Sequence, residues 1–289
     1  MCRIFGFRSV LQSGVHQSLL DADNAIIQQS QRHPDGWGVA YYKMGSPHLI
    51  KMDNQAHNCR IFQKISGVVS SDTVIAHIRK STVGEIGPLN THPFQFGRWV
   101  FAHNGNISHF VKLKDEFLSA VDPELRSFIL GDTDSEVLFY VLLTLIKQKG
   151  DLAEKVKWDF QDLLQTFVDK VQSIAGPLQM SNGDYDRNYL TFLLTNGRFM
   201  LGLQGGQGLF YSTHKAKCPE RGQCSFFAEK CEKPSQAGDI VQHLLITSEQ
   251  IRGDNVWNLM KFGEFVGVDD QLQLFSGQLA MSFLSESGE

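Results

Sequence analysis

The chain has 289 residues, of which 42% are hydrophobic and 20% are charged, an ordinary balance for a globular protein. Its net charge of -4 and its scattered basic residues give no electrostatic reason to expect nucleic-acid binding. The longest apolar run, residues 137–146, is shorter than the roughly 20 residues of a membrane span, and no secretory signal is recognisable, so we expect a cytoplasmic protein without a membrane span.

The first part of the chain contains four stretches that fit β-strands, each bounded by Gly, Pro or Asn turn signals. They are residues 3–8, 38–43, 73–78 and 99–102. A helical pattern near residues 16–31 falls between the first two. This part therefore reads as a sheet with intervening helices.

Helical patterns dominate from about residue 108 to residue 175. Within them, residues 137–146 are apolar nearly all round, which predicts a helix packed between two layers. Strand-like segments then return at residues 189–195, 198–203 and 240–247, with a turn at Asn196-Gly197 between the first two.

This order of elements predicts sheets sandwiched by helices. No internal repeat and no low-complexity linker interrupts the chain, so we expect residues 1–289 to form a single domain. The tail after residue 276 lacks strong periodicity, and we expect it to be loosely held.

Cys2 directly follows the initiator methionine. Aminopeptidases remove Met before small residues, which would give Cys2 a free α-amine with a pKa of about 7.7–8.0. That amine could take the thiol proton directly or through water, so that one residue supplies both the nucleophile and the base. The alternative is a small buried residue at the start of a strand.

Arg79 stands at the end of the predicted strand over residues 73–78, before a loop that runs through Thr82 to His92. An arginine at a strand end is well placed to bind a carboxylate with two parallel hydrogen bonds. The alternative is an arginine in a surface ion pair.

Asn104-Gly105 follows the apolar strand predicted over residues 99–102. A side-chain amide and a backbone N–H at such a place can act as two donors to a developing oxyanion. The alternative is a tight turn, for which Asn-Gly is a common choice.

Thr133 and Glu136 have the spacing of a capping box at the start of the apolar helix. Asp134 then falls in the first helical turn. There it either complements the helix dipole or receives the ammonium group of a ligand, and this segment alone does not favour one reading over the other.

Together, Cys2, Arg79-x-x-Thr82, Asn104-Gly105 and Thr133-Asp134, with Asp35-Gly36-Trp37-Gly38, resemble the motifs of the class II glutamine amidotransferases. The resemblance is closer to stand-alone members, such as those of ergothioneine synthesis and glutathione breakdown. It runs in order through residue 136, continues more weakly to the strands near Leu203 and to residues 254–257, and covers most of the chain.

The resemblance implies an α+β fold, the four-layer αββα sandwich of the N-terminal-nucleophile hydrolases. It also implies that Cys2 attacks the side-chain amide of glutamine or of another γ-glutamyl compound, forming a thioester and releasing ammonia or an amine. No cofactor and no metal is expected. The roles carried over by position are these: Arg79 binds the α-carboxylate with help from Thr82 and His92, Asp134 binds the α-ammonium, and Asn104 and Gly105 form the oxyanion hole.

One departure affects the loop that contacts glutamine. At two positions flanking the loop threonine, the sugar-phosphate-synthase branch of the family typically has Trp and His, whereas this chain has Lys80 and Val83. The pocket for the leaving group is therefore expected to differ from the pocket of that branch.

Two versions of the activity remain open. One delivers ammonia to a separate acceptor subunit, and the other cleaves a γ-glutamyl derivative as an end in itself. The second is favoured slightly, because no acceptor domain is recognisable after about residue 275. A different class of function is a non-catalytic ligand-binding or assembly protein. It would apply if Met1 is retained, because the nitrogen of Cys2 is then an amide without basicity.

His214, Cys218, Cys224 and Cys231 offer nitrogen and sulfur donors of the kind that bind zinc. Their spacing is irregular and lacks a CxxC pair, so we expect reduced cysteines on a hairpin or loop instead.

Overall fold

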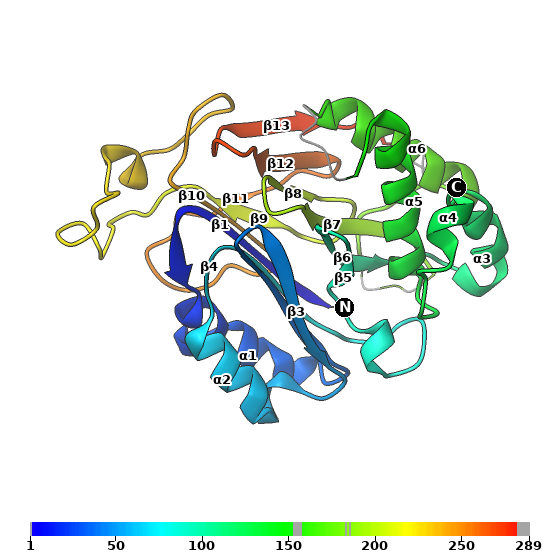
Figure 1. Ribbon diagram of the computed structural model, residues 1–289, viewed down its shortest axis with the longest axis horizontal. Coiled ribbons are helices and arrows are strands. Elements are labelled where there is room, and N and C mark those ends of the chain that lie inside the picture. The colour runs from blue at the N-terminus through cyan, green and yellow to red at the C-terminus, as the bar shows by residue number, and fades with distance from the viewer. Residues whose placement is uncertain (1, 153–157, 183, 185, 282–289) are drawn as a thin grey trace, which may run out of the picture.

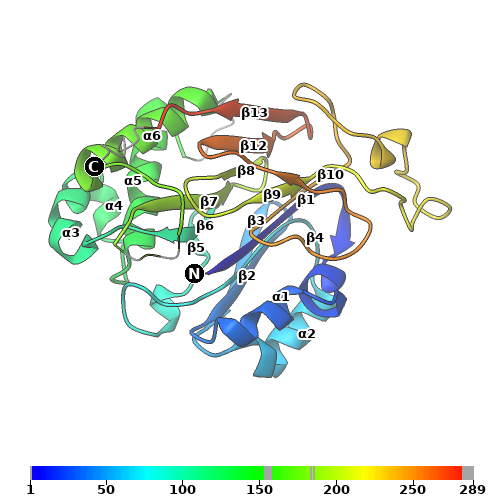
Figure 2. The same ribbon diagram turned by 180° about the vertical axis from the view of Figure 1, so that it is seen from behind.

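The computed structural model describes residues 2–152, 158–182, 184 and 186–281. Within these residues, two antiparallel sheets lie face to face with helices on their outer faces (Figures 1 and 2). The described helices that cover the sheets are α1 (Ile26–Gln29), α2 (Arg60–Val68), α3 (Phe110–Ser119), α4 (Pro123–Arg126), α5 (Asp134–Lys149) and α6 (Phe160–Ala175).

The first sheet has seven strands in the described chain, in the order β11-β9-β10-β1-β4-β2-β3. Its strand β1 lies between β4 and β10, with Arg3 opposite Ile78 and Phe5 opposite Thr247. The bounds of its strands are β1 (Arg3–Gly14), β2 (Trp37–Lys43), β3 (Ser46–Met52), β4 (Ser70–Ile78), β9 (Phe210–Ser212), β10 (His243–Thr247) and β11 (Asn258–Leu259).

The second sheet has six strands among the described residues, in the order β13-β12-β8-β7-β6-β5. Its strands β6 and β7 are paired along their length, from Val100 opposite Thr195 to Asn106 opposite Tyr189. The bounds of its strands are β5 (Phe94–Phe96), β6 (Trp99–Asn106), β7 (Tyr189–Thr195), β8 (Met200–Leu203), β12 (Glu264–Val268) and β13 (Leu274–Gln278).

Three buried hydrophobic layers separate the four structural layers. Trp37 of the first sheet packs on Phe62 of α2 with ring centroids 5.0 Å apart. Between the sheets, Ile4 and Ile75 belong to the same cluster as Ala102 and residues of β7 and β8. Beyond the second sheet, clusters of aromatic and aliphatic side chains fill the space under α5 and α6. The fold is therefore the αββα sandwich expected from the sequence, which confirms the predicted fold class.

Helix α5 confirms the interpretation of the long apolar run. Every residue from 137 to 146 is buried. Phe139 stacks on Phe101 of β6 at 5.4 Å, while α3 and α6 contact the same helix. The helix is covered on more than one side, so its sequence needs no polar stripe.

Two expectations about secondary structure are corrected. The helical pattern near residues 16–31 forms only short pieces, because extended backbone at Ala22 and Ala25 separates a π-helical turn (Gln17–Asp21) from α1. The tail after residue 276 is not loose at its start: β13 extends to Gln278, which pairs with Glu264. Residues 282–289 of that tail lie outside the described residues.

A close approach at Gly38 joins the two sheets near the end that carries the motifs. A Cβ atom at Gly38 would lie 2.1 Å from the carbonyl oxygen of His92 and 2.9 Å from the Cδ of Pro93. Because the obstacle includes backbone atoms, a side chain at position 38 forces the segment that leads into β5 to move.

We therefore expect Gly38→Ala to lower the free energy of unfolding by about 1–3 kcal/mol, the usual cost of overpacking a buried contact. Urea denaturation measures this change. Gly208→Ala is the matched control, because Gly208 is exposed and its Cβ would meet nothing within 4 Å. Equal stability of both variants would contradict the close approach.

Candidate active site

Cys2 lies directly before β1, the central strand of the first sheet in the described chain. Its Sγ accepts a hydrogen bond from the N–H of Lys80 at 3.2 Å and lies 3.4 Å from the carbonyl oxygen of the same residue. Ile4, two positions along, points into the space between the sheets. Because side chains alternate along a strand, Cys2 belongs to this inner face as well.

Burial raises the pKa of the Cys2 thiol above its ordinary value. The hydrogen bond from Lys80 and the positive charge of Arg79 act in the opposite direction, while the negative charge of Asp134 raises the pKa further. Arg79 and Asp134, the two charged residues that the sequence singled out, therefore act on the pKa of this thiol in opposite directions.

Arg79 follows β4 and is only 2% exposed, so the alternative of a surface ion pair is wrong. Its Nη1 donates to the carbonyl oxygen of Glu85 at 3.0 Å, and its Nη2 donates to Val83 O at 3.0 Å and to Ser81 Oγ at 3.1 Å. The guanidinium has five N–H groups. Among the described residues, Nε–H and one Nη1–H have no partner, so these two donors remain for a ligand.

Thr82 and His92 lie at opposite ends of the same loop. Thr82 is exposed, and the structure does not bring its side chain into the buried cluster. His92 is 4% exposed and stacks on His77 of β4 with ring centroids 4.2 Å apart. Neither ring nitrogen of His92 has a hydrogen-bond partner in the described chain, and burial holds its pKa well below the ordinary value. Its ring is neutral and has one N–H to donate.

Asn104 and Gly105 lie within β6, opposite Thr191 and Leu190, so the alternative of a tight turn is wrong. Ala102 faces the first sheet, and by alternation Asn104 does so too. The side chain of Asn104 is 2% exposed, and its Oδ1 has no partner among the described residues. Asn104 is thus a buried amide on the same inner face as Cys2.

Asp134 is the first residue of α5 and is 3% exposed. Its Oδ2 accepts a hydrogen bond from the N–H of Ile107 at 2.8 Å, which ties the helix start to the end of β6. Thr133 is the N-cap residue, as predicted, and accepts from the N–H of Glu136 at 3.2 Å. The capping box itself is incomplete, because the Glu136 carboxylate accepts instead from the N–H groups of Leu130 and Gly131.

Contacts between loops hold these groups together. Asp35 Oδ2 accepts from the N–H of Ser81 at 2.9 Å. Asn90 and Asp132 exchange two hydrogen bonds between the side chain of Asn90 and the backbone and side chain of Asp132. The loop that surrounds Arg79 is thereby fastened to the segment before α5.

The sequence did not single out His77, His103 or Ser135 as site residues. His77 lies on the same inner face as Arg79. The two-residue spacing of His77 and Arg79 in an extended segment could have predicted this shared face. His103 and Ser135 meet across the second sheet and α5, a contact of 2.8 Å between Nδ1 and Oγ that no sequence spacing indicates.

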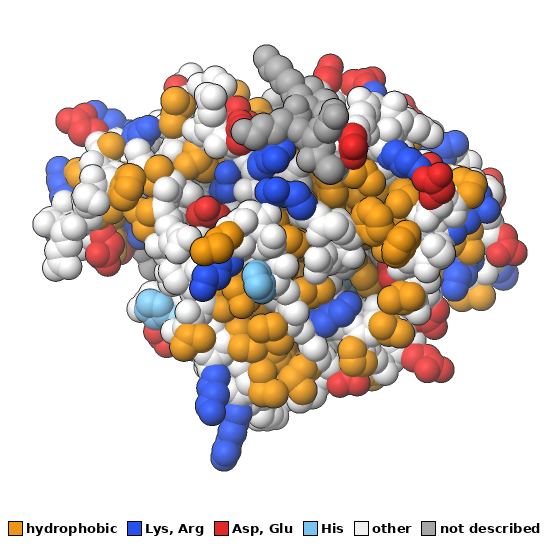
Figure 3. Space-filling model, in the orientation of Figure 1, with side chains coloured by type: hydrophobic (Ala, Val, Ile, Leu, Met, Phe, Trp, Pro, Cys, Tyr) orange, Lys and Arg blue, Asp and Glu red, His pale blue; other side chains and the backbone are white. Residues whose placement is uncertain are grey.

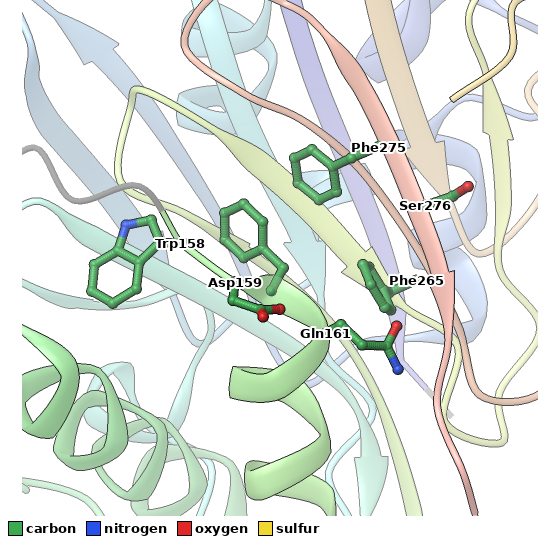
Figure 4. Close-up of a pocket in the computed structure, with 7 residues that line it drawn as sticks. Trp158, Asp159, Gln161, Phe265, Phe275 and Ser276 are labelled. Carbon is green, nitrogen blue, oxygen red and sulfur yellow. The ribbon is translucent and has the colours of Figure 1, made fainter. Parts of the chain in front are cut away.

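Other features of the molecule lie apart from this cluster. A hollow of about 480 Å³ lies beside the start of α6 and strands β12 and β13. It is lined by Trp158, Phe160, Phe265 and Phe275 together with Asp159, Gln161 and Ser276 (Figure 4). None of the residues predicted for the site lines it.

No set of three His, Cys, Asp or Glu side chains in the described part of the chain is arranged to bind a metal, and His214 with the three cysteines that follow it makes no such group. In the same ranges, none of the helices is long and apolar enough to span a bilayer. On the face shown in Figure 3, Lys and Arg side chains are interspersed with Asp and Glu.

Comparison with known proteins places this arrangement in a family. The family model "Glutamine amidotransferases class-II" matches residues 1–273. "Probable glutamine amidotransferase DUG3" of Saccharomyces cerevisiae is 30% identical over 220 residues, which cover 68% of this chain and 61% of the yeast protein. The chain therefore spans less than two thirds of that relative's length.

Solved structures share the fold. A glutamine aminotransferase class-II domain protein from Silicibacter pomeroyi superimposes with a TM-score of 0.62 at 17% identity, covering 96% of this chain and 100% of that one. Glutamine phosphoribosylpyrophosphate amidotransferase from Bacillus subtilis gives a TM-score of 0.60 at 16% identity, covering 97% of this chain and 50% of that one. The family match over residues 1–273, on this fold, shows that the chain belongs to the class II glutamine amidotransferases.

Proposed function

We propose that this protein hydrolyses the side-chain amide of glutamine or of a γ-glutamyl compound, with Cys2 as the nucleophile after removal of Met1. The observation that carries the proposal is the position of the Cys2 sulfur. It lies against the backbone of Lys80 and under the influence of both Arg79 and Asp134. A thiol flanked by one buried cation and one buried anion matches a substrate that carries a carboxylate and an ammonium beside its amide.

In the proposed reaction, the free α-amine of Cys2 takes the thiol proton, and the sulfur attacks the amide carbon. The side-chain amide of Asn104 and the N–H of Gly105 stabilise the negative oxygen of the tetrahedral intermediate. The protonated α-amine then donates its proton to the leaving nitrogen. Ammonia or an amine departs, and the acyl group remains on Cys2 as a thioester. Water hydrolyses the thioester to release the γ-carboxylate and the thiol.

The head of the substrate is proposed to bind between Arg79 and Asp134. The N–H groups of Arg79 that the loop leaves without a partner would hold the α-carboxylate, with the neutral ring of His92 as a further donor. The Asp134 carboxylate would accept from the α-ammonium. We propose no cofactor for this chemistry. All five cysteines are free thiols, and a reducing compartment such as the cytoplasm suits a cysteine nucleophile.

The leaving group distinguishes two versions of this function, and one observation favours a protein partner. Four apolar side chains are exposed on the two loops that the Asn90–Asp132 pair fastens together: Ile86 (58%), Leu89 (54%), Phe128 (50%) and Leu130 (66%). Exposed apolar groups beside a site favour contact with another protein. A separate subunit that accepts ammonia is therefore the proposed partner, and cleavage of a γ-glutamyl derivative alone is the other version.

Cys2→Ala should abolish the release of ammonia from glutamine and of amines from γ-glutamyl compounds while the protein stays folded, because it removes the nucleophile and little volume. Ammonia release and the intact mass of the native protein are the measurements. Cys218→Ala is the matched control and should keep full activity. Retention of Met1 in the native protein, or a Cys2→Ala variant within about tenfold of the wild-type rate, would contradict the proposal.

The two charges should shift the ionisation of Cys2 in opposite directions. Asp134→Asn removes a negative charge and should lower the pKa of the thiol, so alkylation by iodoacetamide reaches its full rate at a lower pH. Arg79→Met removes a positive charge and should move the same profile to higher pH. Mass mapping of the alkylated Cys2 peptide across neutral and alkaline pH gives the profiles, and the Cys224 peptide is an internal control. Shifts in the reverse order would show that these charges do not act on Cys2.

Asn104→Ala should lower kcat by about 10²–10³ and change KM little, because its donor acts mainly on the charge of the tetrahedral intermediate. Steady-state kinetics with glutamine measures both constants. Asn188→Ala provides the comparison, since Asn188 is a buried amide whose side chain, in the described chain, donates to Ala175 O and Pro177 O and accepts from the N–H of Ser108. That variant should lose stability and keep its kcat. A rise in KM alone for Asn104→Ala would contradict the role of Asn104 in the oxyanion hole.

A further inference from the structure

His103 lies on β6 with its ring buried beneath α5. Its Nε2 is 3.1 Å from the carbonyl oxygen of Tyr189, and its Nδ1 is 2.8 Å from the hydroxyl oxygen of Ser135. A carbonyl oxygen only accepts, so Nε2 carries the hydrogen. Burial lowers the pKa of His103, although Asp134 and the bond to Tyr189 partly oppose this, so the ring is neutral. Nδ1 therefore carries a lone pair and accepts a hydrogen bond that the Ser135 hydroxyl donates.

Ser135 has one hydroxyl hydrogen and two acceptors within reach. The first is His103 Nδ1 at 2.8 Å, and the second is Asp134 Oδ1 at 3.2 Å. A hydrogen that is given to the imidazole cannot also be given fully to the carboxylate. Among the described residues, the remaining donors to Asp134 are backbone groups, the N–H of Ser135 at 2.7 Å and the N–H of Ile107 at 2.8 Å.

We propose that His103 holds the hydroxyl hydrogen of Ser135 away from Asp134 and so keeps the Asp134 carboxylate available for the cationic group of the substrate. This inference rests on the proposed function and adds a positioning residue to it. In the described chain the side chain of His103 contacts Ser135, Tyr189 and Phe101, and it is not among the groups proposed to bind the substrate or to react. His103 acts by orienting the hydroxyl group of Ser135, the residue next to Asp134, whose carboxylate is proposed to bind the substrate.

The backbone around His103 fits this role. A Cβ atom at Gly105 would lie 2.0 Å from His103 Nε2 and 2.2 Å from the oxygen of Tyr189, so the bond between the ring and Tyr189 passes directly over Gly105. The ring can hold this tautomer and this position only because residue 105 is glycine. The same ring adds a side-chain hydrogen bond between β6, the strand that carries Asn104, and Tyr189 of β7.

The test compares His103→Phe with the double variant His103→Phe, Ser135→Ala, using Ser135→Ala as the reference. In His103→Phe the hydroxyl is free to turn to Asp134 and compete with the α-ammonium. We expect kcat/KM for L-glutamine to fall about tenfold or more through a higher KM, since a hydrogen bond to a charged group has that effect. The double variant should recover most of this loss, because it lacks the hydroxyl. Both variants leave the oxygen of Tyr189 without its donor, so a purely structural defect would persist in both.

Glutaramate, which is glutamine without the α-amino group, is the matched substrate. Its cleavage should differ between the three variants by less than about threefold, because it brings no cation to Asp134. Equal losses on both substrates, or no recovery in the double variant, would overturn the inference. If the wild-type protein shows no Cys2-dependent cleavage, the proposed function is refuted instead. In that case the preference for L-glutamate over glutarate, measured by calorimetry in the same variants, decides the inference.

A spectroscopic measurement is independent of activity and of how the variants fold. Long-range ¹H–¹⁵N correlation on the wild-type protein reports which ring nitrogen of His103 carries the hydrogen. The expected result is a neutral ring with hydrogen on Nε2 and a lone pair on Nδ1. Observation of an Nδ1–H tautomer or of an imidazolium at neutral pH would overturn the proposal.

Discussion

The antiparallel pairing of β1 with β4 decides where the candidate groups of this protein meet. With Arg3 opposite Ile78, the residue before β1 reaches the backbone of Lys80 just beyond β4. Alternation along both strands then turns Cys2 and Arg79 toward the second sheet, which presents Asn104. A slip of β1 by one residue in this register would send Cys2 to the opposite face, under α1 and α2, while Arg79 stays on the inner face. The proposed chemistry therefore depends on a pairing that the hydrophobic layers on both faces hold in place.

Much of the fold could be predicted because its strongest signals are local. The apolar helix α5 and the strands that bear Ile4, Ile75 and Ala102 are visible in residue patterns alone. Strand β3 is not, since its sequence is mixed and its turn uses Met44-Gly45, both at positive φ, where Asn-Gly is the usual signal. Strand β12 pairs with β13 on one side and with β8 on the other, and the local sequence of a single segment does not indicate such pairing.

The candidate site could be predicted as a set of residues and not as a set of contacts. Cys2, Arg79 and Asp134 stand out because their residue types and motifs are unusual. The partners of their side chains were inaccessible to sequence, because they come from elsewhere: loop carbonyls for Arg79, and the N–H of Ile107 for Asp134. Such contacts depend on how two loops lie relative to each other in the folded chain. The folded arrangement of the loops therefore determines which groups hydrogen-bond to a buried charge.

The two sides of the site differ in how they are held. Strand β1 lies in the middle of a seven-stranded sheet in the described chain and is paired with both β4 and β10 over residues 5–8. We expect the amides of these residues to exchange with solvent when the sheet itself opens. The loop after β4 is held largely by side chains, above all by the guanidinium of Arg79 on Val83 O and Glu85 O. A ligand bound to the N–H groups of Arg79 that the loop leaves without a partner would keep the guanidinium on Val83 O and Glu85 O and so hold the loop. Binding would then register as slower hydrogen exchange around Val83, with the protection of β1 unchanged.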